Sequence, residues 1–285
     1  MREREEKFKA TRKLEAKEKQ DAEDAHWEAQ WALSLSEAIR TRELLNCWKN
    51  FDRIHDKVLT LTNLTSVRLI GHKLTYIPEA FCDNLLQLKS LSFSNNELVE
   101  LPVRLGNLTG LTDLNVLKNK LIALPESLCV LTELVKIDLS NNKLESLPVH
   151  FGALSSLRGV LTIDENQLTE LPMSVGDLAI ESICVSRNLV TELPPSISRL
   201  SKLKSLVVNG CKLSKFPSEI VDLPHLRHVS LCRNELTDIA PDIGKLVKLE
   251  NLWLDWNKIR VLPDSIANCT NMKYLKLEGN PMIQP

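Results

Sequence analysis

A frame of apolar residues that returns about every 23 positions constrains this chain more than any other feature of its sequence. In its clearest copy, residues 134–148, apolar residues stand at offsets 0, 3, 5, 10 and 13, with an asparagine at offset 8 and a proline at offset 14. The copies start at Leu64, Leu88, Leu111, Leu134, Arg158, Ile180, Leu203, Leu226, Leu249 and Met272. A fixed period of about 20 to 50 residues is typical of solenoids, in which each repeat packs only on its neighbours. The sequence therefore predicts a solenoid.

The columns of this frame have a physical meaning. Offsets 3 and 5 alternate across a short strand, so Ile137 and Leu139 are expected to point into the core. The amide of an asparagine at offset 8 can bond backbone groups that are left unpaired as the chain leaves the strand. Eight copies carry this asparagine: Asn96, Asn119, Asn142, Asn166, Asn188, Asn234, Asn257 and Asn280. His72 and Cys211 take its place in the first and seventh copies.

Two further columns follow the strand. Proline at offset 14 fixes φ where the chain turns toward the convex side, and small residues at offset 18 allow the convex segments to pack closely. The small residues are Cys82, Gly106, Cys129, Gly152, Gly176, Ser198, Gly244 and Ala267, with Val221 as the exception. The fifth copy carries one extra residue before its strand, so a bulge or slight bend is expected near Gly159.

Two segments precede the repeats. Residues 1–24 interleave charges of both signs and contain acid-before-base pairs four residues apart, such as Glu15 and Lys19, which favour a helix. A helix that is polar all round is either a solvated, frayed helix or a strut docked on a larger assembly. Residues 25–57 form an amphipathic helical cap over the first repeat or, as the alternative, a helix that binds a partner's groove. Their apolar face consists of Trp27, Trp31, Leu35, Ala38, Leu45 and Trp48.

Residues 58–285 complete the predicted organisation as a solenoid of about ten repeats. Residues 58–64 are expected to lead into it as a degenerate edge strand. The tenth copy stops at Pro285 with no amphipathic cap after it. Because an apolar end is not left open, we expect a longer parent protein or another component to cover it.

Charge and cysteine content narrow the class of protein. The formal net charge of −1 gives no argument for nucleic acid or a membrane surface as a partner. No apolar run approaches the roughly 20 residues that a membrane-spanning helix needs. The seven cysteines are scattered, without a C-x-x-C pair or a flanking cluster, which favours a reducing, cytoplasmic location. In that compartment the glycosylation patterns at Asn63, Asn107 and Asn268 are accidental.

The tails of the repeats resemble a known family. Residues 101–108, LPVRLGNL, and residues 262–266, LPDSI, follow the pattern L-P-x-x-[LIF]-x-x-L. Together with the L-x-x-L-x-L-x-x-N-x-L strands, they resemble cytoplasmic leucine-rich repeats of the Ras-suppressor, scribble-like and plant Ras-group-related type. The resemblance covers residues 58–285 and implies an α/β fold, a right-handed horseshoe with parallel strands on its concave face. It also implies protein binding, as scaffolds, GTPase-pathway regulators, phosphatase partners or subunits of ciliary and other cytoskeletal assemblies.

Signatures of catalysis are missing from the sequence. It contains no H-E-x-x-H, no phosphate-cradling lysine loop and no G-x-S-x-G. His225 and His228 lie three residues apart without a cysteine or acidic partner at a metal-ligand spacing. Asp164 and Glu165 are better explained as solvated surface than as a general acid and base. We therefore expect neither an enzyme nor a bound cofactor or metal.

The predicted binding surface is the concave face, which offsets 1, 2, 4, 6 and 7 should line. Early repeats place small polar residues there, such as Ser90 and Ser92, and the middle repeats place acids. The predicted partner-binding residues lie in the last three repeats: Arg227, His228, Arg233, Trp253, Asp255, Trp256, Tyr274 and Lys276. Exposed tryptophans beside arginine and tyrosine have the composition of interface hot spots. The alternative is that both tryptophans stack on neighbours and only stiffen the sheet.

Two functions of different class are consistent with this surface. The first is a protein-binding scaffold or a structural subunit of a larger assembly, for which the resemblance implies a cytoskeletal or ciliary setting. The alternative is a regulatory or targeting subunit in a phosphatase or small-GTPase pathway. In both cases the partners are proteins, with no nucleic acid and no membrane.

Overall fold

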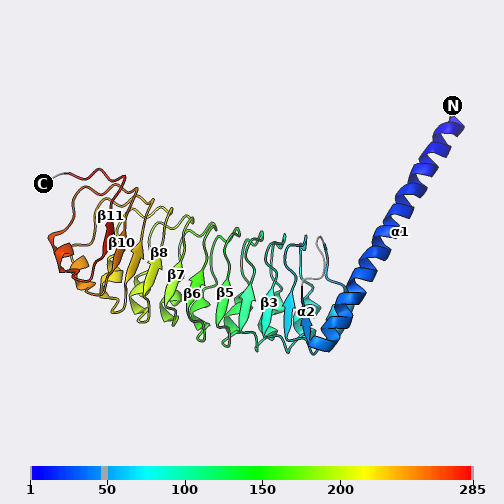
Figure 1. The fold of residues 1–285 in the computed structure, drawn as a ribbon, viewed down its shortest axis with the longest axis horizontal. Helices are drawn as coiled ribbons and strands as arrows, with labels where there is room; N and C mark the ends of the chain where they lie inside the picture. Colours follow the sequence, from blue (N-terminus) through cyan, green and yellow to red (C-terminus); the bar gives the residue numbers. More distant parts are fainter. Residues whose placement is uncertain (1, 46–50, 284–285) are drawn as a thin grey trace.

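The computed structural model describes residues 2–45 and 51–283, which form an elongated solenoid with a long helix at its N-terminal end (Figure 1). The strands are short and parallel, and they form a single open sheet in the order of the sequence. They are β1 (Glu43–Leu44), β2 (Ser66–Arg68), β3 (Ser90–Ser92), β4 (Asp113–Asn115), β5 (Lys136–Asp138), β6 (Val160–Thr162), β7 (Ser182–Cys184), β8 (Ser205–Val207), β9 (His228–Ser230), β10 (Asn251–Trp253) and β11 (Tyr274–Lys276). The predicted α/β solenoid with a parallel concave sheet is confirmed.

Short helical segments return the chain along the convex side between strands. They are α2 (Glu79–Asn84) and the 3-10 helices η1 (Asp56–Thr60), η2 (Val103–Asn107), η3 (Glu126–Val130), η4 (Phe151–Ala153), η5 (Met173–Asp177), η6 (Pro195–Arg199), η7 (Ser218–Asp222), η8 (Ile243–Lys245) and η9 (Asp264–Asn268). The helix α1 (Arg2–Thr41) has 40 residues. None of the helices in the described residues is long and apolar enough to cross a membrane.

Equivalent residues of neighbouring repeats stack in register and form one continuous core. Ile137 of β5 pairs with Leu114 of β4, and both side chains point inward. Leu139, two residues further on, is fully buried. Because each apolar side chain lies against its counterparts in the flanking repeats, stability arises mainly between neighbours along the solenoid.

The asparagine column forms the expected ladder. The Nδ2 atom of Asn142 donates to the carbonyl oxygens of Val116 and Leu139, each at 3.0 Å, and its Oδ1 accepts from the N–H of Leu121 at 3.1 Å. The other seven asparagines bond in the same way. Each amide thus joins two repeats and satisfies buried backbone groups that would otherwise destabilise the fold.

The small-residue column is also explained by the packing. A Cβ atom on Gly152 would lie 1.9 Å from the carbonyl oxygen of Ser174, and one on Gly176 would lie 2.2 Å from that of Ser196. No side chain fits at these distances without moving the next repeat. The glycines therefore set how closely the convex segments approach one another.

One column is visible only in the structure. The residue at offset 7 of every repeat has a positive φ, and these residues are Gly71, Asn95, Lys118, Asn141, Glu165, Arg187, Gly210, Arg233, Trp256 and Gly279. Glycine and asparagine adopt this left-handed conformation readily, whereas other residues lose roughly 1–2 kcal/mol in it. The repeat geometry therefore imposes the conformation even where the local sequence opposes it.

The start of the sheet differs from the expected one in two respects. The chain continues after α1 directly into β1, whose Leu44 pairs with Val67 of β2, and this adds an eleventh strand to the ten predicted. The prediction of an edge strand at residues 58–64 is wrong, because residues 56–60 form η1. The backbone hydrogen bonds at the edge of β2 are taken by the segment that follows α1, so residues 58–64 are free to form a convex turn.

The end of α1 packs on the first repeat while its N-terminal part projects away from the solenoid (Figure 1). Trp31, Leu35 and Ala38 are buried, and the Trp31 ring stacks on Phe51 with centroids 4.7 Å apart. Leu45, expected on the same apolar face, lies beyond the helix and is exposed. Trp48 lies outside the described residues.

Polar contacts surround this apolar junction. The Nε2 atom of His55 donates to a carboxylate oxygen of Glu28 at 3.1 Å, and this hydrogen bond lowers the pKa of Glu28. The Nδ1 atom of His55 accepts the N–H of Lys57 and so caps η1. Trp27 stacks on the His55 ring with centroids 4.9 Å apart. One histidine thus links the helix to the first convex turn.

The irregular fifth repeat behaves as predicted. Gly159 has a φ of +71°. The strands β5 and β6 share a single residue pair, Asp138 with Thr162, where most neighbouring strands share three. The extra residue is absorbed locally, and the pairing of the strands is interrupted where a bulge or slight bend is expected.

Candidate functional site

The concave face carries two surfaces of different chemistry. The first, named the C-terminal patch, consists of the predicted residues Arg227, His228, Arg233, Trp253, Asp255, Trp256, Tyr274 and Lys276, which the structure brings together on and beside β9, β10 and β11. The second, named the serine hollow, is a depression across β2 to β6. Each position on these surfaces is set by the alternation of side chains along the strand.

Trp253 lies in the middle of the C-terminal patch. By strand register it stands between Ser230 of β9 and Lys276 of β11, and 39% of its surface is exposed. The Nζ atom of Lys276 lies 4.9 Å from the centroid of its ring. This is a cation–π contact, which holds the two side chains together on the surface.

Trp256 occupies the left-handed position of its repeat, with a φ of +59°, and 54% of its surface is exposed. A Cβ atom on Gly279 would lie 2.7 Å from the Trp256 ring, so the indole rests directly on the backbone of the next repeat. A bulky side chain in this conformation is unusual. Trp256 therefore combines stacking on a neighbour with an open outer face.

Two polar members of the patch already serve the fold. An oxygen of Asp255 accepts the backbone N–H of Glu278 at 2.9 Å. Arg227 precedes β9 at the rim and forms an ion pair with Glu250 at 2.8 Å. Glu250 also pairs with Lys273 at 2.6 Å, and the hydrogen bonds from Lys273 and Arg227 lower the pKa of Glu250.

The remaining polar members are more available. His228 is hydrogen-bonded to Asn251 across the strands. Within the described residues, the side chain of Arg233 has no ion pair, and Tyr274 is 62% exposed. A partner could therefore reach Arg233 and Tyr274 without displacing an existing contact.

A small hollow beside Trp253 does not follow from the sequence. It has a volume of about 180 Å³ and lies over β8, β9 and β10. It is lined by Ser205, Val207, His228, Val229, Ser230, Asn251 and Trp253. The short side chains on β8 leave room beside the indole, and this juxtaposition arises only when repeats 23 residues apart are stacked.

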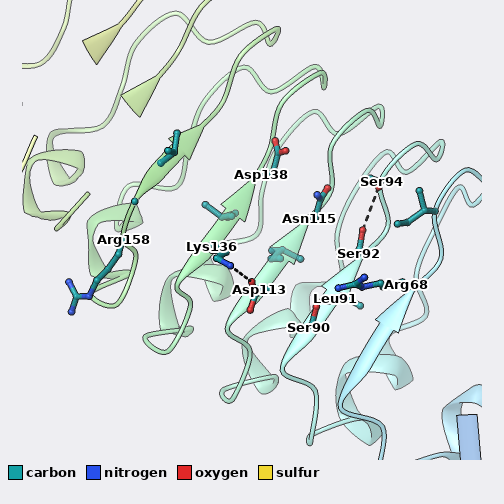
Figure 2. Close-up of a pocket in the computed structure, with 15 residues that line it drawn as sticks. Arg68, Ser90, Leu91, Ser92, Ser94, Asp113, Asn115, Lys136, Asp138 and Arg158 are labelled. Carbon is teal, nitrogen blue, oxygen red and sulfur yellow. Dashed lines mark hydrogen bonds and ion pairs between the residues drawn. The ribbon is translucent and has the colours of Figure 1, made fainter. Parts of the chain in front are cut away.

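The serine hollow is larger, with a volume of about 550 Å³ (Figure 2). It is lined by Arg68, Ile70, Ser90, Leu91, Ser92, Ser94, Asp113, Leu114, Asn115, Lys136, Ile137, Asp138, Arg158, Gly159 and Val160. The sequence places several of these residues on the concave face but assigns no binding role to them. The sequence feature that marks this hollow is a run of serines in one repeat. The longer basic side chains beside it come from other repeats and are brought there by the fold.

The acids of the serine hollow are already engaged. Asp113 accepts a hydrogen bond from the Thr112 hydroxyl at 2.7 Å and lies 3.8 Å from the Nζ atom of Lys136. Asp138 accepts the N–H of Ser140 at 3.0 Å. Arg68 and Arg158, by contrast, make no ion pair within the described part of the chain. The lining thus holds three basic side chains against two acids, and Asp113 is the acid that forms an ion pair.

Potential metal ligands are scattered over residues 2–45 and 51–283. These residues contain no cluster of three or more histidine, cysteine or acidic side chains able to hold a metal. Asp164 accepts the N–H of Ser186 at 2.6 Å, and Glu165 pairs with Arg187 at 2.5 Å.

The described cysteines are free, and burial shapes their chemistry. Desolvation raises the pKa of Cys82 and Cys129 to about 12 and that of Cys184 to about 11. These thiols stay protonated near neutral pH, and a protonated thiol is a poor nucleophile. The three thiols are therefore poor candidates for a nucleophile.

Comparison with known proteins identifies the repeat. A family model described as Leucine rich repeat matches residues 224–282, and a second model of the same description matches residues 133–154. The repeats are leucine-rich repeats. No curated protein matches the chain in this comparison.

Solved leucine-rich-repeat structures resemble the chain at 25–27% sequence identity. The plant peptide hormone receptor RGFR1 in complex with RGF2 has 25% identity and a TM-score of 0.65, covering 84% of this chain and 46% of the receptor. The receptor kinase ectodomain GASSHO1/SCHENGEN3 from Arabidopsis thaliana, in complex with CASPARIAN STRIP INTEGRITY FACTOR 2, has 27% identity and a TM-score of 0.66. The match covers 82% of this chain and 32% of the ectodomain chain. A chain of the Toll–Spatzle complex from Drosophila has 26% identity and a TM-score of 0.68. The match covers 81% of this chain and 32% of that chain. The chain therefore spans less than half the length of each of these structures.

Proposed function

We propose that this chain is a non-enzymatic interaction scaffold that holds a protein partner on its concave face through the C-terminal patch. The observation that carries this proposal is the pair Trp253 and Trp256, which leave 39% and 54% of their surfaces exposed on one face. Tryptophan is a frequent interface hot spot. In addition, the Trp256 ring rests on the backbone at Gly279 and keeps an open outer face, so it is held in place for contact with a partner.

The similar structures support binding of polypeptides by this fold. The two plant receptor structures are complexes with RGF2 and with CASPARIAN STRIP INTEGRITY FACTOR 2, and the Drosophila structure is a complex of Toll with Spatzle. Because this chain covers less than half of each of these structures, we extend to it only the use of repeats as a recognition surface. The identity of its partner is a separate question.

We further propose a cytoplasmic setting within a larger protein assembly. Protonated, unpaired cysteines suit a reducing compartment. In this proposal residues 25–57 cap the solenoid, and residues 1–24 form a charged strut that contacts a second component. The resemblance to cytoplasmic leucine-rich repeats favours a cytoskeletal or ciliary assembly.

Site-specific photo-cross-linking tests the concave site. A benzoylphenylalanine placed at Trp256 should capture a protein partner in native extracts, whereas one placed at Val103, which is 72% exposed on the convex side, should not capture the same protein. The captured protein is then purified and titrated against variants. We expect the double variant Trp253→Ala, Trp256→Ala to weaken its binding by more than about 30-fold, since hot-spot truncations lose about 2 kcal/mol or more.

Two controls keep this result interpretable. Val103→Ala should bind as the natural chain does. Trp256→Asn retains a residue suited to the left-handed conformation, so it should stay folded with only a small loss of stability and still lose affinity. Equal affinity of the natural chain and the double tryptophan variant would remove the C-terminal patch as the binding site.

A further inference from the structure

We propose that the serine hollow is a second binding site, which takes an extended acidic segment of a protein partner. This inference rests on the proposal that the concave face binds polypeptide. It uses none of the residues of the C-terminal patch, and it assigns a role to the N-terminal half of the concave face.

The shape of the hollow follows from unequal side-chain lengths on neighbouring strands. Ser90 and Ser92 on β3 are short, whereas Arg68 on β2 and Lys136 on β5 are long and stand on either side (Figure 2). The volume of about 550 Å³ lies within the range of about 300–1,000 Å³ that ligand sites occupy. Its lining combines serine, asparagine and charged side chains with apolar ones such as Leu91 and Val160, so it offers both polar and apolar contacts to a ligand.

The floor suits an extended peptide better than a helix. A helix satisfies its backbone hydrogen bonds internally, whereas an extended segment presents free N–H and C=O groups that require partners. The Asn115 oxygen accepts the N–H of Leu117 at 3.0 Å, while its amide nitrogen has no hydrogen bond within the described residues. Ser92 and Ser94 share one hydrogen bond at 3.4 Å, which leaves hydroxyl capacity for a ligand.

The charges of the hollow select an acidic segment. The lining holds three basic and two acidic side chains, and both acids accept hydrogen bonds from the chain itself. Arg68 lies along the β2 rim beside Ser90, and Arg158 extends outward from the β6 rim (Figure 2). Neither arginine has an ion pair in the part of the chain that the structure describes. Guanidinium groups recognise carboxylates through paired, charge-assisted hydrogen bonds.

Strand spacing sets the distance between the two acids of the ligand. Four steps of roughly 4.8 Å separate β2 from β6, which gives roughly 19 Å across the strands. Arg158 lies four residues before Thr162, which is in register with Arg68, so roughly 13 Å along the strands is added and the two Cα atoms lie roughly 23 Å apart. The length of the two arginine side chains covers the difference between this separation and the spacing of acids on a ligand. An extended chain advances roughly 3.3 Å per residue, so side chains six residues apart are roughly 20 Å apart and lie on the same face. The site therefore fits a segment with acidic residues at positions i and i+6.

Titration of the full chain with a defined peptide tests this inference. The probe is a fluorescein-labelled heptapeptide with the sequence ETSVSTE, and the matched control has glutamine at both ends. We expect the control peptide to bind about tenfold more weakly, because each exposed charge pair contributes up to about 1 kcal/mol. Arg68→Gln and Arg158→Gln should each weaken the glutamate peptide by about threefold, and together by about tenfold. Raising the salt concentration should reduce the difference.

Arg260→Gln is the matched control variant, because Arg260 is an exposed arginine that belongs to neither binding surface. It should leave peptide affinity unchanged. The inference is overturned if the glutamate and glutamine peptides bind equally, if neither binds up to millimolar concentration, or if the double arginine variant keeps full affinity. Tighter binding of an oligothymidylate than of the peptide would assign the hollow to nucleic acid and also overturn it. If the cross-linked partner still requires the two tryptophans, only the second site fails.

Discussion

The two ends of the solenoid differ in how their apolar interior is covered. At the N-terminal end, Trp31 and Leu35 of α1 are buried against the first repeat, and β1 extends the sheet. At the C-terminal end all three residues of β11 are exposed, including Leu275 at 36%. Even the asparagine of the last repeat, Asn280, is only partly buried.

This difference shows that position along the solenoid, and not residue type alone, sets what a side chain contributes. Each repeat is covered by the next, so a leucine or asparagine of the same frame is packed on two sides in the middle and on one side at the end. The charged helix and the solenoid are thus coupled at one end by a specific aromatic junction. Substitutions at the two ends and in the middle should therefore change the free energy of unfolding by different amounts.

The largest expected effect is at the N-terminal junction. Trp31→Ala should lower the free energy of unfolding by about 3–5 kcal/mol, because a fully buried indole is replaced by a cavity. Leu275→Ala at the other end should cost less than about 1 kcal/mol, since that side chain is already partly solvated. Urea unfolding gives the two free energies, and hydrogen exchange should show lost protection in the first repeats for Trp31→Ala only.

Trp31→Phe sharpens this comparison. The Nε1 atom of Trp31 is buried without a hydrogen-bond partner, so phenylalanine keeps much of the packing and removes an unsatisfied donor. It should be clearly more stable than Trp31→Ala. Equal losses for Trp31→Ala and Leu275→Ala would contradict the proposed asymmetry of the ends.

A smaller effect is expected along the asparagine ladder. Asn142→Ala removes hydrogen bonds to Val116, Leu139 and Leu121 and leaves buried backbone groups unpaired, so it should cost about 1–3 kcal/mol. Asn280→Ala should cost less, because water reaches the groups it leaves. Thermal and urea unfolding of both variants measure the difference. A loss at Asn280 as large as that at Asn142 would show that exposure does not weaken the ladder.

The smallest effect is a pH dependence of the N-terminal end. Burial lowers the pKa of His72 below its ordinary value of 6.5, so on acidification the unfolded chain takes up a proton before the folded chain does. The free energy of unfolding should therefore fall as the pH drops below about 6.5. The slope from this residue cannot exceed about 1.4 kcal/mol per pH unit.

His72→Asn places the usual ladder residue at that position and removes the titrating group. Its stability should change less between pH 7 and pH 5 than that of the natural chain, in urea titrations at both values. An unchanged pH dependence would show that His72 does not cause the effect.

Much of the fold could be predicted because every repeat has the same residue pattern, which fixes which residues of neighbouring strands lie side by side. Ile137, Leu139 and Asn142 occupy the expected positions, and so does the irregularity at Gly159. The edge strand was placed wrongly at residues 58–64, because an edge strand of two residues leaves no periodic pattern. The predicted patch residues do lie together on the concave face, but their binding role stays a prediction.

Other features could not be predicted, for physical reasons that differ. The left-handed conformation of Lys118 and Trp256 opposes local preference and is imposed by the stacked turns. The stacking of Phe51 on Trp31 and on His72 joins segments whose contact depends on how α1 docks.

The sequence alone determined that the chain is a solenoid, which residues face its interior and which column bonds successive turns, because these properties repeat with the period of the chain. Tertiary structure alone decided where the concave face is hollow, which charges there stay unpaired and how the first repeat is covered. Those properties depend on side chains that lie about one or more repeat lengths apart in the sequence and meet only when the repeats stack.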